Sequence, residues 1–160
     1  MTMSEMRISG GCQCGVVRFQ IGELGRASIC HCRMCQKAFG GFFGPLVTAN
    51  GLVWTRGEPA WFQSSNKARR AFCNACGTPL AYDYGGPIEV AIGALDDPEC
   101  APPALQNNPA EKLSFTDGLS SLPIRDTQAL PEVAAFLASL VSYQHPDHDT
   151  DRWPLEGAGR

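Results

Sequence analysis

The sequence has no excess of positive charge. Its 13 lysines and arginines are outnumbered by 16 aspartates and glutamates, which gives a formal net charge of -3 at pH 7. Nucleic-acid-binding proteins draw much of their affinity from a general positive field. The composition therefore predicts that nucleic acid is not a partner of this chain.

Long unbroken hydrophobic runs are also missing. An uncharged segment at 38–55 is interrupted by Gly40, Gly41, Gly44 and Pro45, which favour turns over a helix. A membrane-spanning helix needs about 20 mostly apolar residues. No membrane partner is therefore expected. The chain is also not expected to be disordered, because 44% of its residues are hydrophobic.

The amino terminus lacks the apolar core of a secretory signal, and it carries Glu5 and Arg7. We therefore expect a cytoplasmic, reducing location. Cysteine is nevertheless abundant, with eight in 160 residues, and in a reducing compartment such a pattern indicates metal or redox chemistry rather than disulfides. The cysteines form a C-x-C pair, a C-x-C-x-x-C triplet, a C-x-x-C pair and one isolated residue: Cys12 and Cys14; Cys30, Cys32 and Cys35; Cys73 and Cys76; Cys100.

The remaining pattern predicts a mainly β, antiparallel fold. Asn50-Gly51 is a typical two-residue hairpin signal between two of the expected strands. Short alternating or apolar segments bounded by turn residues predict strands at 16–21, 46–48, 52–55, 60–63, 71–72, 80–82 and 88–92.

Helix signals are few. The sequence predicts one short helix at 32–39 and a C-terminal helix at 131–140, which has Pro131 in its first turn. A surface loop is expected at 98–109, and a frayed polar tail from Tyr143 onward.

Four cysteines are predicted to form a closed structural zinc site. Zinc in such sites takes four ligands in a tetrahedron, and closely spaced cysteine pairs can each supply two. The second cysteine of two pairs is followed by glycine, Gly15 or Gly77, which allows the backbone to fold tightly and aim amides at sulfur. The alternatives are ordinary buried cysteines or a redox pair. The four predicted ligands are Cys12, Cys14, Cys73 and Cys76.

The triplet Cys30, Cys32 and Cys35 predicts a zinc site with three protein ligands and one open position, as in catalytic sites. Three thiolates suit a further soft ligand, so the expected substrate is a thiol that coordination deprotonates. Nearby cations could offset the charge or bind an anionic thiol, although each could equally lie on a solvated surface. The candidate cations are Arg33, Lys37, Arg69 and Arg70, with Lys67 close by in sequence.

The segments 11–15, 30–37 and 70–80 resemble the glutathione-dependent formaldehyde-activating family, also described as CENP-V/GFA domain proteins. The similarity spans roughly residues 8–122. It implies Mss4-like antiparallel sheets folded around structural zinc, with the same division of the seven cysteines into two sites. It also implies zinc as cofactor and glutathione as co-substrate, in the carbon–sulfur lyase chemistry that joins glutathione and formaldehyde.

On this basis we expect a zinc-binding β domain at 1–125, followed by a C-terminal helix and polar tail at 126–160. Two zinc ions per chain are expected. The occupancy of the three-ligand site stays open, because such a site binds metal more weakly than a closed one. Homodimerisation stays open. The competing hypotheses are a non-catalytic zinc-stabilised binding module and a redox or metal-handling protein.

Three further cysteine and histidine residues are expected to lie outside both sets of zinc ligands. Cys100 follows Pro98 in the expected surface loop and is not expected to complete the triplet. His31 lies between two ligands and is expected to point away from the metal, either exposed or behind the ligands. His145, with the histidine and aspartates that follow it, imitates a metal site by composition only.

Overall fold

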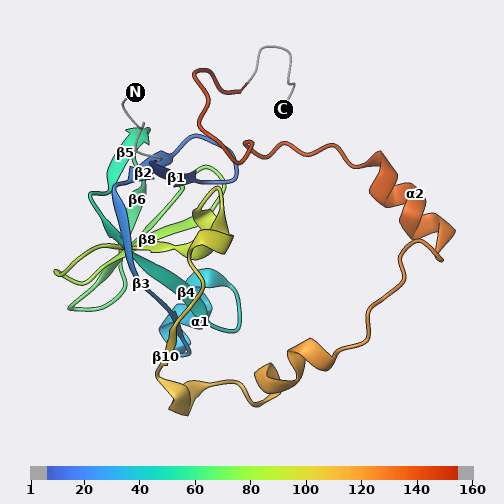
Figure 1. The fold of residues 1–160 in the computed structure, drawn as a ribbon, viewed down its shortest axis with the longest axis horizontal. Helices are drawn as coiled ribbons and strands as arrows, with labels where there is room; N and C mark the ends of the chain where they lie inside the picture. The colour runs from blue at the N-terminus through green and yellow to red at the C-terminus, as the bar shows by residue number, and fades with distance from the viewer. Residues whose placement is uncertain (1–6, 155–160) are drawn as a thin grey trace, which may run out of the picture.

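A computed structural model describes residues 7–154 of the chain, which is mainly β as predicted (Figure 1). A small antiparallel sheet has the strand order β1-β2-β5, with bounds β1 Ile8–Gly11, β2 Arg18–Ile21 and β5 Val53–Arg56. A second sheet has the order β10-β3-β4-β9-β8-β7-β6. Its strands are β3 Glu23–Cys30, β4 Gly44–Asn50, β6 Ala60–Gln63, β7 Arg69–Phe72, β8 Pro79–Asp83, β9 Glu89–Ala91 and β10 Leu105–Asn107.

The core follows from strand alternation. In β2, Phe19 and Ile21 are buried while Gln20 between them is only half-buried, so one face of this short strand is turned inward. Val47 of β4 and Val90 of β9 are opposite each other in the sheet and are fully buried. Apolar side chains from both sheets therefore meet in one core cluster, to which Cys12 and Cys73 also belong.

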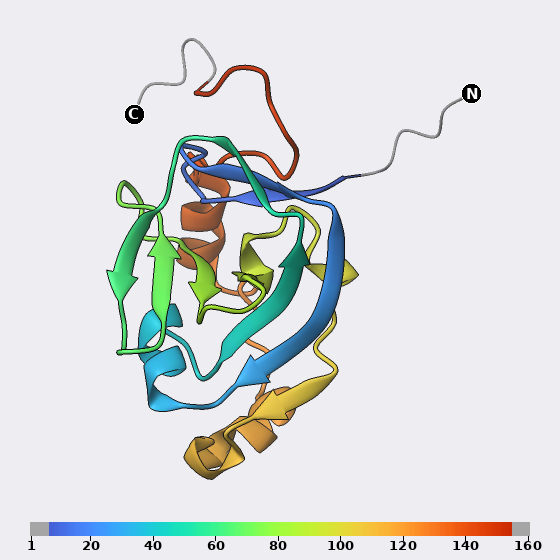
Figure 2. The same cartoon turned by 90° about the vertical axis from the view of Figure 1, so that its left-hand side faces the viewer.

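The hairpin predicted at Asn50-Gly51 is wrong. β4 pairs with β3 and β9, whereas β5 pairs with β2 in the other sheet. Both neighbouring positions of β4 are occupied, so the turn carries the chain from one sheet to the other; Gly51 takes a φ of 70° there. The link from β2 to β3 at Gly22 also passes from the small sheet to the large one. It lies beside the link from β4 to β5, because the amide of Gly22 donates to the carbonyl of Asn50 at 3.0 Å (Figure 2).

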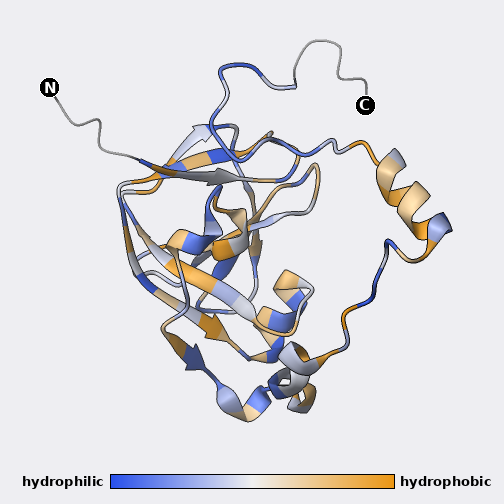
Figure 3. Ribbon diagram, turned by 45° about the vertical axis from the view of Figure 1, so that its right-hand side comes forward, coloured by the Kyte–Doolittle hydropathy of each residue, from blue (hydrophilic) through white to orange (hydrophobic). Residues whose placement is uncertain are grey.

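Both predicted helices form. α1 spans Arg33–Phe39 and stops at Gly40, which has the left-handed φ of 60° that suits glycine at a helix end. α2 spans Pro131–Ser139 and buries no residue, and Figures 1 and 3 show it apart from the sheets with apolar residues along it. Short 3-10 turns complete the chain: η1 Ile92–Ala94, η2 Pro98–Cys100, η3 Pro109–Glu111 and η4 Ser114–Ser121.

The surface loop predicted at 98–109 is partly a strand. Residues Leu105–Asn107 form β10, which pairs in parallel with the end of β3 and places Asn107 opposite Cys30. A three-residue edge strand with two asparagines near its end carries no recognisable strand pattern, so its pairing depends on the exposed edge that β3 offers.

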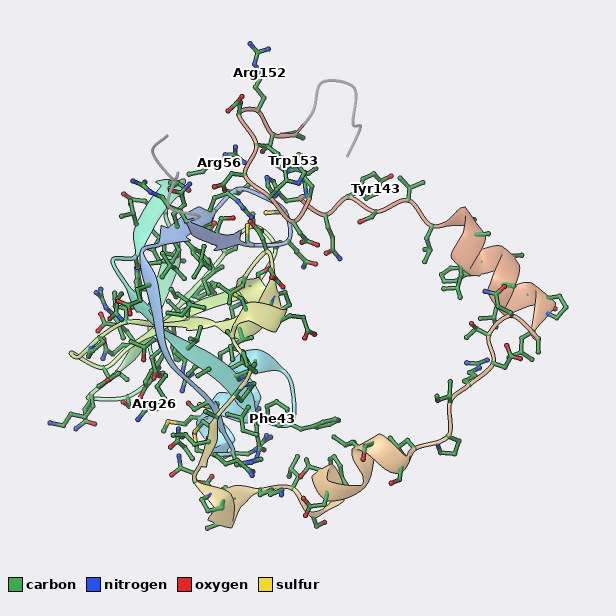
Figure 4. The ribbon with its side chains drawn as sticks, in the orientation of Figure 1. Arg26, Phe43, Arg56, Tyr143, Arg152 and Trp153 are labelled. Carbon is green, nitrogen blue, oxygen red and sulfur yellow. The ribbon has the colours of Figure 1, made fainter. Side chains whose placement is uncertain are left out.

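The polar tail is not frayed. The chain returns to the small sheet, where the amide of His145 donates to the carbonyl of Gln13 at 2.7 Å and Trp153 Nε1 donates to the carbonyl of Cys14 at 2.7 Å. Arg18 is buried and binds both Asp96 and Asp149, because a buried guanidinium requires carboxylate partners. Figure 4 shows Trp153 beside Arg56 at this end of the molecule.

Within residues 7–154, no helix combines the length and the apolar character that crossing a membrane requires.

Candidate metal centres

The structure brings together the four cysteines of the predicted closed site. Their sulfur atoms lie within 4.8 Å of one another. The Cys12 and Cys14 sulfurs are 3.5 Å apart, and those of Cys14 and Cys73 are 3.7 Å apart. A tetrahedron with Zn–S bonds of about 2.3 Å has edges of about 3.8 Å. The donor set and its spacing therefore fit a zinc ion.

Two glycines shape this site as the sequence indicates. Gly15 and Gly77 have φ angles of 75° and 79°, in the region that favours glycine. These angles close a tight turn at each cysteine pair: Gly15 N donates to the carbonyl of Cys12 at 3.0 Å and Gly77 N to that of Cys73 at 2.8 Å. The turn next to Cys12 also lets an amide, Val17 N, donate to its sulfur at 3.3 Å.

The thiols of this cluster differ strongly in pKa. Burial raises the pKa of Cys14 to about 12. Burial also opposes ionisation of Cys76, but the hydroxyl and amide of Thr78 outweigh it and lower the pKa of Cys76 to about 6. Four thiols in one place cannot all ionise without a cation, so metal binding there would release protons and weaken at low pH.

The triplet Cys30, Cys32 and Cys35 also converges. The three sulfurs lie within 4.8 Å of one another, contributed by the end of β3, the N-cap of α1 and the first turn of α1. Among residues 7–154, no fourth histidine, cysteine, aspartate or glutamate joins them, and Cys100 is exposed on η2. The chemistry of the donors fits a zinc ion with one position left for another ligand.

Hydrogen-bond donors from distant parts of the chain reach these sulfurs. Asn108 Nδ2 donates to Cys30 Sγ at 3.1 Å, and Arg70 Nη2 donates to Cys35 Sγ at 3.4 Å. Against the effect of burial, the backbone amide of Cys32 and the side chain of Asn108 lower the pKa of Cys30. Burial dominates at Cys35 and raises its pKa to about 12 in spite of Arg70.

A cavity of about 440 Å³ opens onto the triplet. This volume is within the range of about 300–1,000 Å³ that is typical of small-molecule sites. Besides the three cysteines, its lining includes residues that the sequence analysis missed: Tyr82, Glu89, Asn108 and Glu111. Glu89 had a detectable signal, a lone charge inside the apolar run 88–92, whereas nothing local distinguishes Asn108.

The predicted cations occupy different places. Arg70 lines the triplet cavity and also a neighbouring cavity of about 360 Å³, together with Arg33 and Lys37. Arg69 does not line either cavity, because successive residues of β7 point to opposite faces; it pairs with Asp83 at 2.8 Å and stacks on Trp61.

Two histidines are also placed. His31 is buried, with Nε2 2.8 Å from Gln106 Oε1 and its ring packed against that of Phe43. His145 is buried against Trp153 and contacts Arg56 and Thr150.

The chain is similar to known proteins. A crystal structure of a Rhodobacter sphaeroides protein is similar to the chain at 22% sequence identity and a TM-score of 0.49, covering 62% of this chain and 99% of that one. The family model for the glutathione-dependent formaldehyde-activating enzyme matches residues 7–108, which include all seven clustered cysteines. Because that match spans more than half of the 160 residues, the chain belongs to the glutathione-dependent formaldehyde-activating enzyme family.

Proposed function

We propose that this chain is a zinc-dependent carbon–sulfur lyase of the S-(hydroxymethyl)glutathione synthase type. It adds a thiol, with glutathione the leading candidate, to formaldehyde or a related small carbonyl compound. One observation carries the proposal: three converging cysteine sulfurs line an open cavity and, among residues 7–154, have no fourth ligand from the chain.

Zinc held by Cys30, Cys32 and Cys35 would supply an open position at which a thiol is held as its thiolate. The chain's own contribution is to keep the ligating sulfurs charged and oriented. Asn108 and Arg70 each donate a hydrogen bond to one of them, and donors to a ligand typically tune metal affinity about 10–100-fold.

The cations beside the triplet support an anionic thiol as the substrate. Arg70 is 9% exposed, its guanidinium lies 4.7 Å from the Tyr82 ring centroid, and its Nε has no hydrogen-bond partner among the described residues. A buried donor without a partner is costly, so a carboxylate of the substrate is a fitting acceptor. Arg33 and Lys37, on the wall of the adjoining cavity, could bind a second carboxylate of glutathione.

The test is a titration of the cobalt-substituted protein with glutathione, followed by absorption spectroscopy. We expect a new sulfur-to-cobalt band and, in an isotope-exchange NMR assay, formation of the formaldehyde adduct faster than in buffer. An unchanged spectrum together with an uncatalysed rate would refute the proposal and favour a non-catalytic zinc-stabilised module.

A matched pair of variants tests the choice of thiol. Replacing both Arg33 and Lys37 by glutamine should weaken binding of glutathione while leaving binding of the neutral thiol 2-mercaptoethanol unchanged. Arg69→Gln is the control, because Arg69 lines neither cavity. Equal losses for both thiols would contradict an anionic-substrate site.

We assign the protein to the cytoplasm, because seven ligating thiols require reducing conditions.

A further inference from the structure

Glu89 is a buried carboxyl group in the wall of the cavity that contains the cysteine triplet. It comes from β9 and is 7% exposed, and the cavity it lines is also lined by Cys30, Cys32 and Cys35. Placing a carboxyl group in such a position costs free energy unless it is paired or neutral. A role at the reacting centre would explain its presence.

Strand register places Glu89 in a row with the residue that contacts Cys35. Tyr82 of β8 lies opposite Glu89 on one side and opposite Arg70 of β7 on the other. Side chains opposite each other in adjacent strands share one face of a sheet. The row Arg70, Tyr82, Glu89 therefore runs along the cavity wall, starting at a hydrogen bond to a ligating sulfur.

The charge of Glu89 is only weakly compensated. It forms an ion pair with Arg26 at 3.7 Å, and the Arg26 side chain is 58% exposed. Burial outweighs this cation and raises the pKa of Glu89 above its ordinary value. A carboxyl group with a raised pKa holds a proton more readily than an ordinary carboxylate, so it can accept a proton and return it within the same reaction.

We propose that Glu89 is the proton-transfer residue of the thiol–carbonyl addition, an inference that rests on the proposed function. The thiol loses its S–H proton to the Glu89 carboxylate as its sulfur becomes a thiolate. The sulfur lone pair then forms the S–C bond, the π pair of the carbonyl moves to oxygen, and Glu89 delivers the same proton to that oxygen. The sum is RSH plus H₂CO giving RSCH₂OH, with no external acid or base, and the cleavage direction reverses each movement.

The other ionisable groups facing this cavity are less suited. A guanidinium such as that of Arg70 offers hydrogen-bond donors and no acceptor, and burial raises the pKa of Tyr82 so that the phenol holds its proton. Glu111 lies exposed at the cavity wall and accepts a hydrogen bond from the backbone amide of Arg33 at 2.8 Å. The three cysteines are the proposed metal ligands, and Arg26 is a cation at the far side of Glu89.

The test counts protons released when glutathione binds to the zinc-loaded protein. Calorimetry in buffers of different ionisation enthalpy is carried out between about pH 5 and 8, where a free thiol with a pKa near 8.5 is still mostly protonated. Wild type should release fewer protons per thiol than Glu89→Gln over part of this range, because Glu89 retains the proton. In Glu89→Gln, kcat should fall by about 100-fold or more.

Two control variants separate this role from a structural one. Glu111→Gln removes a carboxylate at the same cavity and should leave the proton count at the wild-type value. Arg26→Gln removes the ion-pair partner of Glu89, and the proton count of this variant should stay at the wild-type value. If Glu89 served only to pair with Arg26, the proton count of Arg26→Gln would instead equal that of Glu89→Gln. Equal proton counts in wild type and Glu89→Gln at every pH, with thiol binding intact, would overturn the inference. Absence of thiol binding in both would instead overturn the proposed function, and the inference with it.

Discussion

The side-chain amide of Asn108 donates to the sulfur of Cys30 at 3.1 Å across 78 positions of sequence. The contact depends on the parallel pairing of β10 with the end of β3, which puts Asn107 opposite Cys30. Asn108 itself has a φ of 53°, a left-handed conformation that asparagine tolerates better than most residues. Backbone pairing thus brings a neutral donor to a candidate metal ligand.

Removing this donor should weaken metal binding at the triplet. Asn108→Gly keeps the left-handed backbone accessible and deletes only the amide, so we expect zinc affinity at the triplet to fall about 10–100-fold. Competition with a chelator measures this affinity in protein whose four-cysteine site, including Cys73, is unchanged. Asn108→Ala adds backbone strain to the same loss and should also lower the melting temperature. Unchanged affinity in the glycine variant would show that the contact does not tune the ligand.

Serine at the two sites should have different effects. Structural zinc in small domains is worth about 10–16 kcal/mol, comparable with a whole folding stability of about 5–15 kcal/mol. We therefore expect Cys73→Ser to be unfolded or insoluble, and Cys32→Ser to keep its circular dichroism spectrum and one zinc ion while losing activity. Metal analysis and circular dichroism distinguish them, with Cys100→Ser as the control. Identical behaviour of the first two variants would contradict the division into a closed and an open site.

Alanine at Gly15 and Gly77, the glycines that follow the two cysteine pairs, should reveal the docking of the C-terminal segment. At Gly77 a Cβ would meet nothing within 4 Å, so Gly77→Ala carries only the backbone cost of a left-handed residue, about 1–2 kcal/mol. At Gly15 the Cβ would lie 2.5 Å from both His145 and Trp153, so Gly15→Ala should lower the melting temperature further.

Truncation after residue 140 is the control for that comparison. It removes both clashing side chains, so in the truncated chain the two alanine variants should lose equal stability in thermal unfolding. A difference that survives truncation would mean that His145 and Trp153 are not the cause.

Glu89 should make stability depend on pH in a defined direction. Because burial raises its pKa in the folded state, the folded protein binds this proton more tightly than the unfolded chain does. The carboxylate therefore destabilises the fold at high pH, and this cost disappears as the pH falls through the folded pKa toward the unfolded value of about 4.3. Glu89→Gln should melt at a higher temperature than wild type at pH 8, and the difference should narrow toward pH 5. A difference that widens on acidification would mean that the pKa of Glu89 is lowered by its surroundings.

The sequence alone determined the division of the cysteines. Gly15 and Gly77 are local signals because a left-handed backbone at the end of a tight turn is needed wherever the turn is placed. The helix α1 and most strands, though not β1, β3 and β10, were also predicted, since alternation and the stop at Gly40 are properties of neighbouring residues.

Only the tertiary structure decided what surrounds the open triplet. Arg70, Tyr82 and Glu89 meet through the register of three strands, and Asn108 arrives through an edge pairing. For the same reason Asn50-Gly51 connects two sheets, and the residues after Tyr143 dock against the small sheet. Local residue preferences specify turns and periodicity, whereas the partner of a strand or of a buried charge is chosen by contacts between residues far apart in sequence.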